Sequence, residues 1–220
     1  MVGDVPGSVL GMLSDLTSKL QHGVLTPDQL ERFLKKQNPF LDEGDSLATW
    51  ARFYFDVFGV EKDFSGLVIP KRKRGFDRLL VMAEGMTPNR LFDKIKELMP
   101  AWRYQDDLDI IVSDRKADHD YAVWIRDRVE ADEELKNLSA NDLKERDVAD
   151  ITFPERLLHE IVFFKETGNH LDVHNWTLCA GSRHPYGHVP CVYWSDDGLG
   201  VSWTDPDDSD VYLRSRAAVL

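Results

Sequence analysis

LCAGSRHPYGHVPCVYWSDDGLGVSWTDPDDSDVYLRSRAAVL, residues 178–220, is the stretch that decides how the C-terminal part of the chain folds. Turn-forming residues interrupt it at Gly181-Ser182, Asp196-Asp197-Gly198 and Asp205-Pro206-Asp207-Asp208. The apolar segments before and between these turns predict four short strands, at 176–180, 189–194, 199–203 and 213–219. We therefore expect a small antiparallel sheet with long polar loops.

The composition of this tail differs from that of the rest of the chain. Every Lys and every Glu lies at or before Glu166, and the last Gln is Gln105. Strands are generally poor in Lys and Glu, but a complete absence over this length exceeds that preference. Groups of Asp, Ser, Gly, Tyr, His, Pro and Val stand between anchors that look fixed, namely VP at 189–190, Trp194, Trp203 and LRSRAAV at 213–219.

The bulk properties of the chain limit its function classes. Its 220 residues suffice for one large domain or for a domain with a helical appendage. Six Trp and eleven Phe supply enough apolar surface for a core. The net charge of −12 argues against non-specific binding to nucleic acid or to anionic membranes. No apolar run is long enough to span a bilayer. The N-terminal residues lack the features of a signal peptide, which predicts a cytoplasmic protein and leaves surface display by another route open.

Residues 1–60 are expected to form a helical N-terminal segment. Leucines at helical spacing predict a first helix, Thr26-Pro27-Asp28 predicts the start of a second that ends before Asn38-Pro39, and a third is expected at 46–58. The aromatic residues of the third helix are interpreted as core or interface residues. This segment is a candidate contact with a partner or with a second copy of the chain.

The middle of the chain predicts mixed structure. Residues 66–70 and 76–84 are expected to pair as strands around a solvated basic loop at 71–74. Thr87-Pro88 predicts a helix to about 98, and 121–129 alternates like a half-buried strand. Three further expectations complete the α+β fold class: a polar surface segment at 131–150, an amphipathic helix that begins at Thr152 and stops at Gly168, and the C-terminal sheet.

The sequence contains one candidate metal site. In a strand, His170, Asp172 and His174 point the same way, and His184 or His188 would complete a set of transition-metal ligands. The same alternation also fits a solvent-facing edge, so a metal-dependent enzyme is kept as an alternative function.

Other chemistry has little support in the sequence. The acidic run Asp205, Asp207, Asp208 and Asp210 leaves a calcium loop open but fails the EF-hand pattern, because position twelve is Arg216 rather than Glu. The two cysteines, Cys179 and Cys191, could form one disulfide, but they are interpreted as two half-buried thiols in a reducing cytoplasm. We see no catalytic constellation, and the sequence predicts neither a catalytic residue, nor a metal, nor a cofactor. An acidic protein-interaction or regulatory module is a further alternative.

The chemistry of the tail resembles that of an antibody paratope. Tyr, Ser, Gly and Asp on a rigid sheet make adaptable contacts at low entropic cost. The candidate anchors of such a surface are Tyr186, Tyr193, Trp203 and Tyr212.

Three stretches carry a resemblance to known proteins: YAVWIRDRVEADEE (121–134), TFPERLLHEIVFFKETGNHLDV (152–173) and the tail. They resemble a protein family of metagenomic bacterial genomes whose C-terminal segment is similar to the variable region of target proteins of diversity-generating retroelements. The resemblance extends from about residue 25 to the C-terminus. In such systems reverse transcription mutates adenines, usually in AAY codons, which can then encode Asn, Asp, Tyr, Ser, His, Pro, Gly, Val or Thr but never Lys, Glu, Gln, Met or Trp.

The resemblance implies a C-type lectin-like domain at 61–220, with two helices, a small twisted sheet and a variable region at about 180–220. The ending LRSRAAVL, in place of the GFR-type ending common in lectin-fold targets, would supply the closing strand. Trp194 and Trp203 would be fixed and point to the core, with their neighbours facing out. The implied function is non-enzymatic binding of a protein or cell-surface ligand, with the variable positions His184, Pro185, Tyr186, His188, Tyr193, Ser195, Asp196, Asp197, Gly200, Ser202, Thr204, Asp207, Asp208, Asp210, Val211 and Tyr212.

Overall fold

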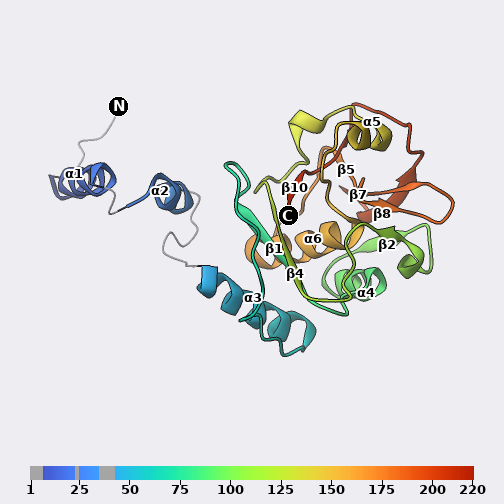
Figure 1. Ribbon diagram of the computed structural model, residues 1–220, viewed down its shortest axis with the longest axis horizontal. Helices are drawn as coiled ribbons and strands as arrows, with labels where there is room; N and C mark the ends of the chain where they lie inside the picture. Colours follow the sequence, from blue (N-terminus) through green and yellow to red (C-terminus); the bar gives the residue numbers. More distant parts are fainter. Residues whose placement is uncertain (1–6, 23–24, 35–42) are drawn as a thin grey trace. The chain divides into compact units, whose positions relative to one another are not determined.

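The computed structural model describes residues 7–22, 25–34 and 43–220 (Figure 1). The chain divides into two compact units, Met1–Trp50 and Ala51–Leu220. The first unit holds α1 (Gly7–Gln21) and α2 (Pro27–Leu34), and α3 (Glu43–Phe58) runs across the boundary. The predicted start of α2 at Pro27 is confirmed, whereas the predicted end at Asn38-Pro39 lies outside the described residues.

The described part of the second unit has an α+β fold with three sheets. The first sheet has the order β1-β4-β10, with β1 Arg78–Met82, β4 Tyr121–Ile125 and β10 Ala218–Val219. The second has the order β2-β8-β7-β5-β9, with β2 Ala101–Arg103, β8 Gly198–Thr204, β7 Val189–Ser195, β5 Trp176–Leu178 and β9 Leu213–Arg214. The third pairs β3 (Val112–Ser113) with β6 (Ser182–Arg183).

The five-stranded sheet is mixed rather than antiparallel as predicted. Strands β5, β7 and β8 are antiparallel neighbours, but β2 joins β8 and β9 joins β5 in parallel. Parallel neighbours need long connections, and these connections bring residues 101–103, far away in the sequence, beside the tail. The sheet that carries the tail is therefore completed by a strand from the middle of the chain.

Helix α6 (Phe153–Thr167) lies in the middle of the C-terminal unit and contacts β1 of one sheet, β7 of the other, and α4 (Pro88–Leu98) (Figure 1). The Thr152 hydroxyl accepts a hydrogen bond from the Glu155 backbone N–H, and the Glu155 carboxylate accepts one from the Thr152 backbone N–H, a capping box that fixes the start of the helix. Gly168, with φ 70°, ends it in the left-handed conformation. Both predicted ends are confirmed.

The remaining helices of this unit are short, except for α4. Thr87 caps α4 and Pro88 is its first residue, as predicted. The others are η1 (Leu108–Ile110), η2 (Glu133–Leu135) and α5 (Ala140–Glu145). The aromatic face of α3 belongs to the core, because Tyr54 is buried and its hydroxyl donates to the Val81 carbonyl oxygen at 2.7 Å. In the part of the chain that the structure describes, none of the helices has the length and apolarity needed to cross a membrane.

Three predictions about the elements are wrong. Residues 66–70 form no strand; Val68 is 84% exposed there, and β1 pairs with β4 instead. Residues 131–150 are not a surface excursion, because Ala140 and Leu143 pack on Leu178 and Cys191. The expected strand at 213–219 is two strands, β9 and β10, in different sheets.

Candidate functional site

The hairpin of β7 and β8 determines which tail residues share a surface. Tyr193 lies opposite Gly200, and Trp194 lies opposite Leu199. Because directly opposed residues in an antiparallel pair point to the same side, Tyr193, Ser195, Ser202 and Thr204 share one side of the sheet with Gly200. Trp194 and Trp203 share the other side. The predicted alternation is thus correct for the two sides, although Trp194 and Trp203 are only half-buried.

Five aromatic side chains form a continuous series of ring contacts at this sheet. Trp176 stacks on Tyr193 with 4.2 Å between ring centroids and 10° between planes. Tyr193 meets Trp102 at 5.8 Å and 77°, and Trp102 meets Tyr104 at 5.0 Å and 83°. Tyr104 then approaches Trp203 at 6.5 Å. We refer to these residues as the aromatic row: Trp176, Tyr193, Trp102, Tyr104 and Trp203.

The aromatic row requires a glycine at position 200. A Cβ atom there would lie 2.7 Å from Cζ2 of Trp102 and 2.9 Å from Cζ of Tyr193, closer than carbon atoms approach without displacement. Gly200 is therefore buried beneath two rings, which corrects its assignment as an exposed variable position. Trp102 and Tyr104 were missed in the sequence, because only the parallel pairing of β2 with β8 brings them to the tail.

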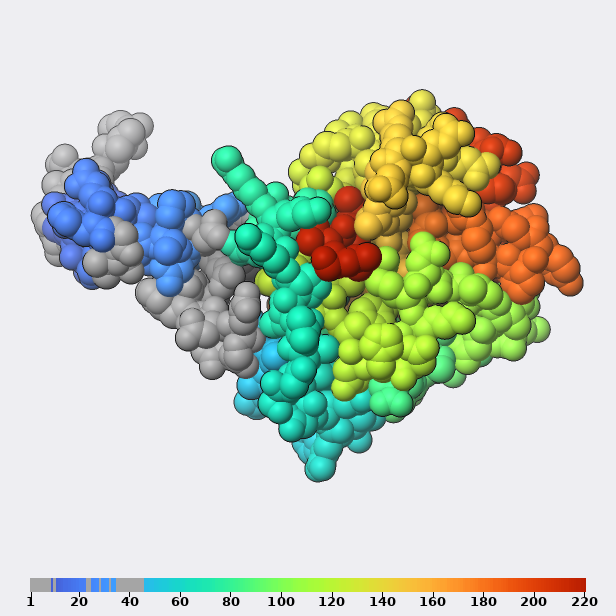
Figure 2. All heavy atoms as spheres, viewed as in Figure 1, coloured from blue at the N-terminus to red at the C-terminus, as the bar shows by residue number. Residues whose placement is uncertain are grey.

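The sixteen candidate positions differ in exposure. In the space-filling view of Figure 2, the orange to red atoms of the tail reach the surface of the C-terminal unit. Nine positions are exposed: Pro185, Tyr186, Asp196, Asp197, Asp207, Asp208, Asp210, Val211 and Tyr212. Five are half-buried: His188, Tyr193, Ser195, Ser202 and Thr204. Two are buried, His184 and Gly200, against the exposure that their spacing predicts.

His184 is buried because it closes a tight loop. Its backbone N–H donates to the His188 carbonyl oxygen at 2.8 Å, and its ring lies 5.3 Å from that of Trp203. Tyr186, at the tip of the same loop, is 86% exposed. The loop thus holds one ring inward as a support and presents another to solvent.

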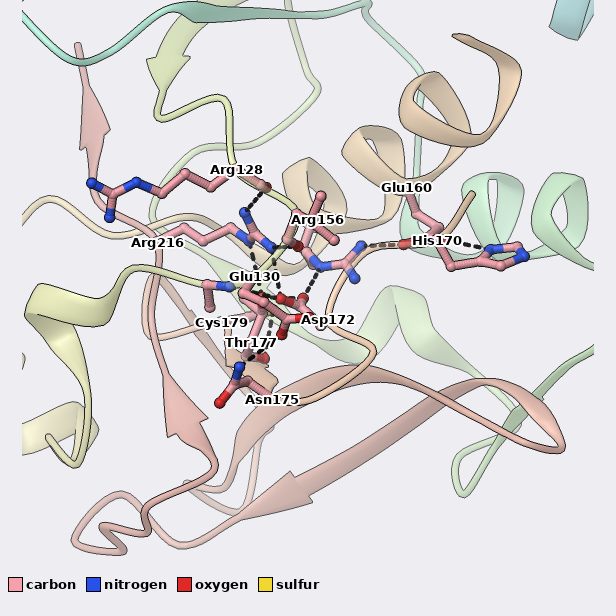
Figure 3. A network of polar contacts seen from close by, with 12 residues as sticks. Arg128, Glu130, Arg156, Glu160, His170, Asp172, Asn175, Thr177, Cys179 and Arg216 are labelled. Atoms are coloured by element: carbon pink, nitrogen blue, oxygen red, sulfur yellow. Dashed lines mark hydrogen bonds and ion pairs between the residues drawn. The ribbon is translucent and has the colours of Figure 1, made fainter. Parts of the chain in front are cut away.

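A buried ionic network connects helix α6 with the tail (Figure 3). Asp172 is fully buried and its carboxylate accepts four hydrogen bonds. Oδ1 accepts from the Ala131 backbone N–H at 2.9 Å and from Arg216 Nη2 at 2.6 Å. Oδ2 accepts from Arg156 Nε at 2.9 Å and from the Thr177 hydroxyl. One carboxylate therefore joins α6, β5 and the C-terminal segment.

The charges of this network compensate one another. Arg156 also donates to Glu160 at 2.9 Å, and Arg216 donates to the carbonyl oxygens of Arg128 and Val129 at 2.9 and 2.7 Å. Burial opposes the charge of the Arg156 guanidinium, but the two neighbouring carboxylates raise its pKa nevertheless. Two guanidinium groups and two carboxylates so placed balance each other's charge, although Arg156 Nη2 is buried without a hydrogen-bond partner. This balance favours a structural role for the network over a catalytic one.

The candidate metal site does not form. Asp172 has φ 54° in an irregular segment rather than a strand, and its oxygens are paired with Arg156 and Arg216. The His170 Nδ1 atom lies 3.0 Å from Glu160 Oε1, and its ring stacks on Trp194 at 3.3 Å. His174 is exposed. Across residues 7–22, 25–34 and 43–220, no group of three or more His, Cys, Asp or Glu side chains is arranged to hold a metal ion.

The acidic loop and the two cysteines also lack the features of a metal or catalytic site. Asp208 accepts from the Thr204 hydroxyl and Asp207 from the Asn141 amide, so their carboxylates do not converge on one point. Cys179 and Cys191 are free and fully buried rather than half-buried, and burial raises the pKa of both thiols. Protonated, enclosed thiols are poor nucleophiles.

Comparisons with protein-family models, with curated proteins and with solved structures find no match for this chain. The side chains of the chain itself are therefore the basis for any proposal about its function. One surface pocket is lined by Arg128, Glu130, Glu133, Glu134 and Arg214. It is a weak candidate for a binding site, because Arg128 already pairs with Glu134 and Arg214 with Glu133.

Asp150 gives a prediction about the pH dependence of stability. It lies just before α6, and burial raises the pKa of its carboxyl from 3.8 to about 7. The unfolded chain therefore releases this proton at lower pH than the folded chain, so Asp150 destabilises the fold progressively as pH rises through this interval. We compare the free energy of unfolding of Asp150→Asn with that of the wild-type chain. The difference in favour of the variant is expected to grow by up to about 1.4 kcal/mol per pH unit between about pH 5 and 7.

Urea denaturation of both proteins at several pH values measures this difference. The comparison is needed because His159 acts in the opposite direction: burial lowers its pKa well below 6.5, so it destabilises the fold as pH falls. His159 is common to both proteins and cancels. A difference between the two proteins that does not change with pH would contradict the prediction.

Proposed function

We propose that the chain is a non-enzymatic ligand-binding protein whose C-terminal face is diversified, as in target proteins of diversity-generating retroelements. The observation that carries the proposal is the match between codon-restricted composition and exposure. Nine of the sixteen candidate positions are exposed, whereas the anchors at 189–190 and most of those at 213–219 are buried, and Trp194 and Trp203 are half-buried. Exposed positions tolerate substitution with little effect on stability, whereas buried anchors do not.

The arrangement of the tail also supports display. The nine exposed positions lie in three connections: the loop before β7, the tip of the β7–β8 hairpin, and the segment between β8 and β9. Loops on a rigid sheet commonly carry binding residues, because the sheet fixes their positions while their sequences vary. We further propose a C-type lectin-like arrangement for residues 61–220, in which α4 and α6 would be the two helices and the five-stranded sheet the display surface.

The buried network would hold this display surface in place while its loops vary. Asp172 precedes β5, and Arg216 lies between β9 and β10. Their ion pair at 2.6 Å thus ties both ends of the candidate region to α6 through Arg156. Two residues of this network, Thr177 just before the tail and Arg216 within it, are expected to be constant.

The genomic surroundings of the gene test the proposal. We expect a reverse transcriptase gene nearby, with a template repeat that matches codons 180–220 and carries adenines where the exposed positions differ. The codons of Trp194 and Trp203 should match the repeat without adenine changes. A completed genome in which the gene has neither a neighbouring reverse transcriptase nor a repeat would count against diversification.

A further inference from the structure

Three of the four outer edges of the two larger sheets are covered by neighbouring segments. The Tyr54 hydroxyl bonds to the backbone of β1, the Ala149 carbonyl oxygen accepts from β10 at 2.7 Å, and the Asn137 backbone N–H donates to β9 at 3.1 Å. An uncovered edge presents backbone groups that can pair with another chain, and such cover prevents that pairing. The fourth edge belongs to β2 (Figure 1).

The outer edge of β2 carries unpaired backbone groups. On its inner edge, β8 donates to the Pro100 carbonyl oxygen at 3.0 Å and accepts from the Tyr104 N–H at 3.4 Å. Because successive residues of a strand direct their backbone groups to opposite edges, the N–H and C=O groups of Ala101 and Arg103 point away from β8. Within residues 7–22, 25–34 and 43–220, these groups have no hydrogen-bond partner, and β8 is the one element in extensive contact with β2.

The side chains of β2 leave this outer edge accessible. The Trp102 indole extends over Gly200 of β8, so it is directed away from the edge. The Arg103 guanidinium donates to Asn89 of α4 at 3.1 Å. Residues 101–103 are half-buried, and the Tyr104 ring that follows them is 69% exposed. The edge therefore offers backbone hydrogen bonds and an aromatic contact to an extended chain, the combination by which sheet edges bind peptides.

Negative charge lies at both ends of this edge. The exposed acidic pair 196–197 forms the hairpin tip, and the next residue, Gly198, adjoins the carbonyl oxygen of Pro100 just before β2. A second exposed acidic pair, 106–107, follows the strand closely. Residues 93–107 together with 196–197 carry six acidic and three basic side chains, which leaves a net charge of −3. A cationic segment complements such an edge.

We propose that the outer edge of β2 binds an extended, lysine- or arginine-rich segment of a protein partner, which joins the five-stranded sheet as a sixth strand. A second copy of the chain fits less well, because two β2 edges paired about a two-fold axis would bring their acidic ends together. The inference goes beyond the proposed diversification, because residues 101–104 precede the tail and would be constant.

Titration of the full chain with capped octapeptides, followed by calorimetry at constant ionic strength, tests the proposal. In the first peptide lysine alternates with valine, and in the second glutamate replaces lysine. The third keeps the lysine–valine sequence but carries N-methyl groups on its four central amides, which block strand pairing without changing the charge. We expect the first peptide to bind about tenfold or more tightly than either of the others.

Hydrogen exchange of the individual amides locates the binding. In the free chain, the amides of Ala101 and Arg103 are expected to exchange rapidly, whereas the Tyr104 amide, which bonds to β8, is protected. Excess lysine–valine peptide should slow exchange at Ala101 and Arg103 about tenfold or more and leave Tyr104 nearly unchanged. Tyr104 is thus a matched control next to the same strand, in a chain that needs no substitution.

Three outcomes would overturn the proposal. Equal binding of the N-methylated peptide would show attraction between charges without strand addition, and equal binding of the glutamate peptide would show an edge with no preference for cations. Slow exchange at Ala101 and Arg103 in the chain alone, with a dimer in sedimentation, would assign the edge to a second copy. None of these bears on diversification. Conversely, a genome without a reverse transcriptase and template repeat would leave peptide binding unaffected.

Discussion

Asp172→Ala is expected to lower the free energy of unfolding by about 3–5 kcal/mol, the largest effect of any single substitution considered for this chain. The substitution leaves the guanidinium groups of Arg156 and Arg216 buried with one carboxylate, Glu160, in place of two. It also removes the acceptors of the Ala131 N–H and the Thr177 hydroxyl. Urea denaturation followed by tryptophan fluorescence measures the change.

Asp196→Ala is the matched control for Asp172→Ala. It removes the same carboxylate from an exposed hairpin tip, where a change within about 0.5 kcal/mol is expected. A loss at Asp172 no larger than the loss at Asp196 would contradict the role of the buried network. Asp172→Asn adds a further comparison, because it keeps the shape of the side chain and removes its charge.

Gly198→Ala is expected to cost about 2–4 kcal/mol, the sum of left-handed backbone strain and overpacking. Gly198 has φ +108°, and a Cβ atom there would lie 2.2 Å from the carbonyl oxygen of Pro100. That carbonyl accepts the Leu199 N–H at 3.0 Å, so it cannot retreat without loss of the bond that connects it to β8. Thermal or urea denaturation of the variant measures the cost.

Gly187→Ala separates the two contributions to this cost. Gly187 has a similar φ of +94° but nothing within 4 Å of the added Cβ, so only backbone strain, about 1–2 kcal/mol, is expected. Equal losses in the two variants would show that contact with Pro100 contributes nothing. The close approach of Pro100 to β8 would then need another explanation.

Elements with local signals could be predicted from the sequence. The starts of α2, α4 and α6 follow from Thr-Pro or capping-box patterns, and the end of α6 from Gly168, because these signals act within a few residues of the helix end. The β7–β8 hairpin follows from its turn residues and alternation in the same way.

Elements that depend on distant partners could not be predicted. Residues 170–174 alternate like a strand, but Asp172 adopts a left-handed conformation that ion pairs with Arg156 and Arg216 hold in place. Those partners lie 16 and 44 residues away. The charged side of an amphipathic helix ordinarily faces solvent, but Arg156, His159 and Glu160 of α6 are fully buried.

The candidate site was predictable as a region but not residue by residue. Composition indicated the tail, and most of its candidate positions reach solvent. His184 and Gly200 share that composition but are buried, because Trp203 and Trp102 cover them. Trp102 and Tyr104 lie outside the unusual composition, and the parallel pairing that brings them to the tail has no signal in the sequence.

The central claim is that the exposed tail positions vary while the buried residues around them stay constant. The most direct test of this claim is to sequence this gene in sibling strains. We expect differences to concentrate at the exposed tail positions, such as Tyr186 and Tyr212, and to spare Trp194, Arg216 and the residues before the tail. His184 and Gly200 should vary less than the exposed positions, because they are buried. Differences spread evenly over the chain, or as frequent at Trp194 as at Tyr193, would contradict the proposal.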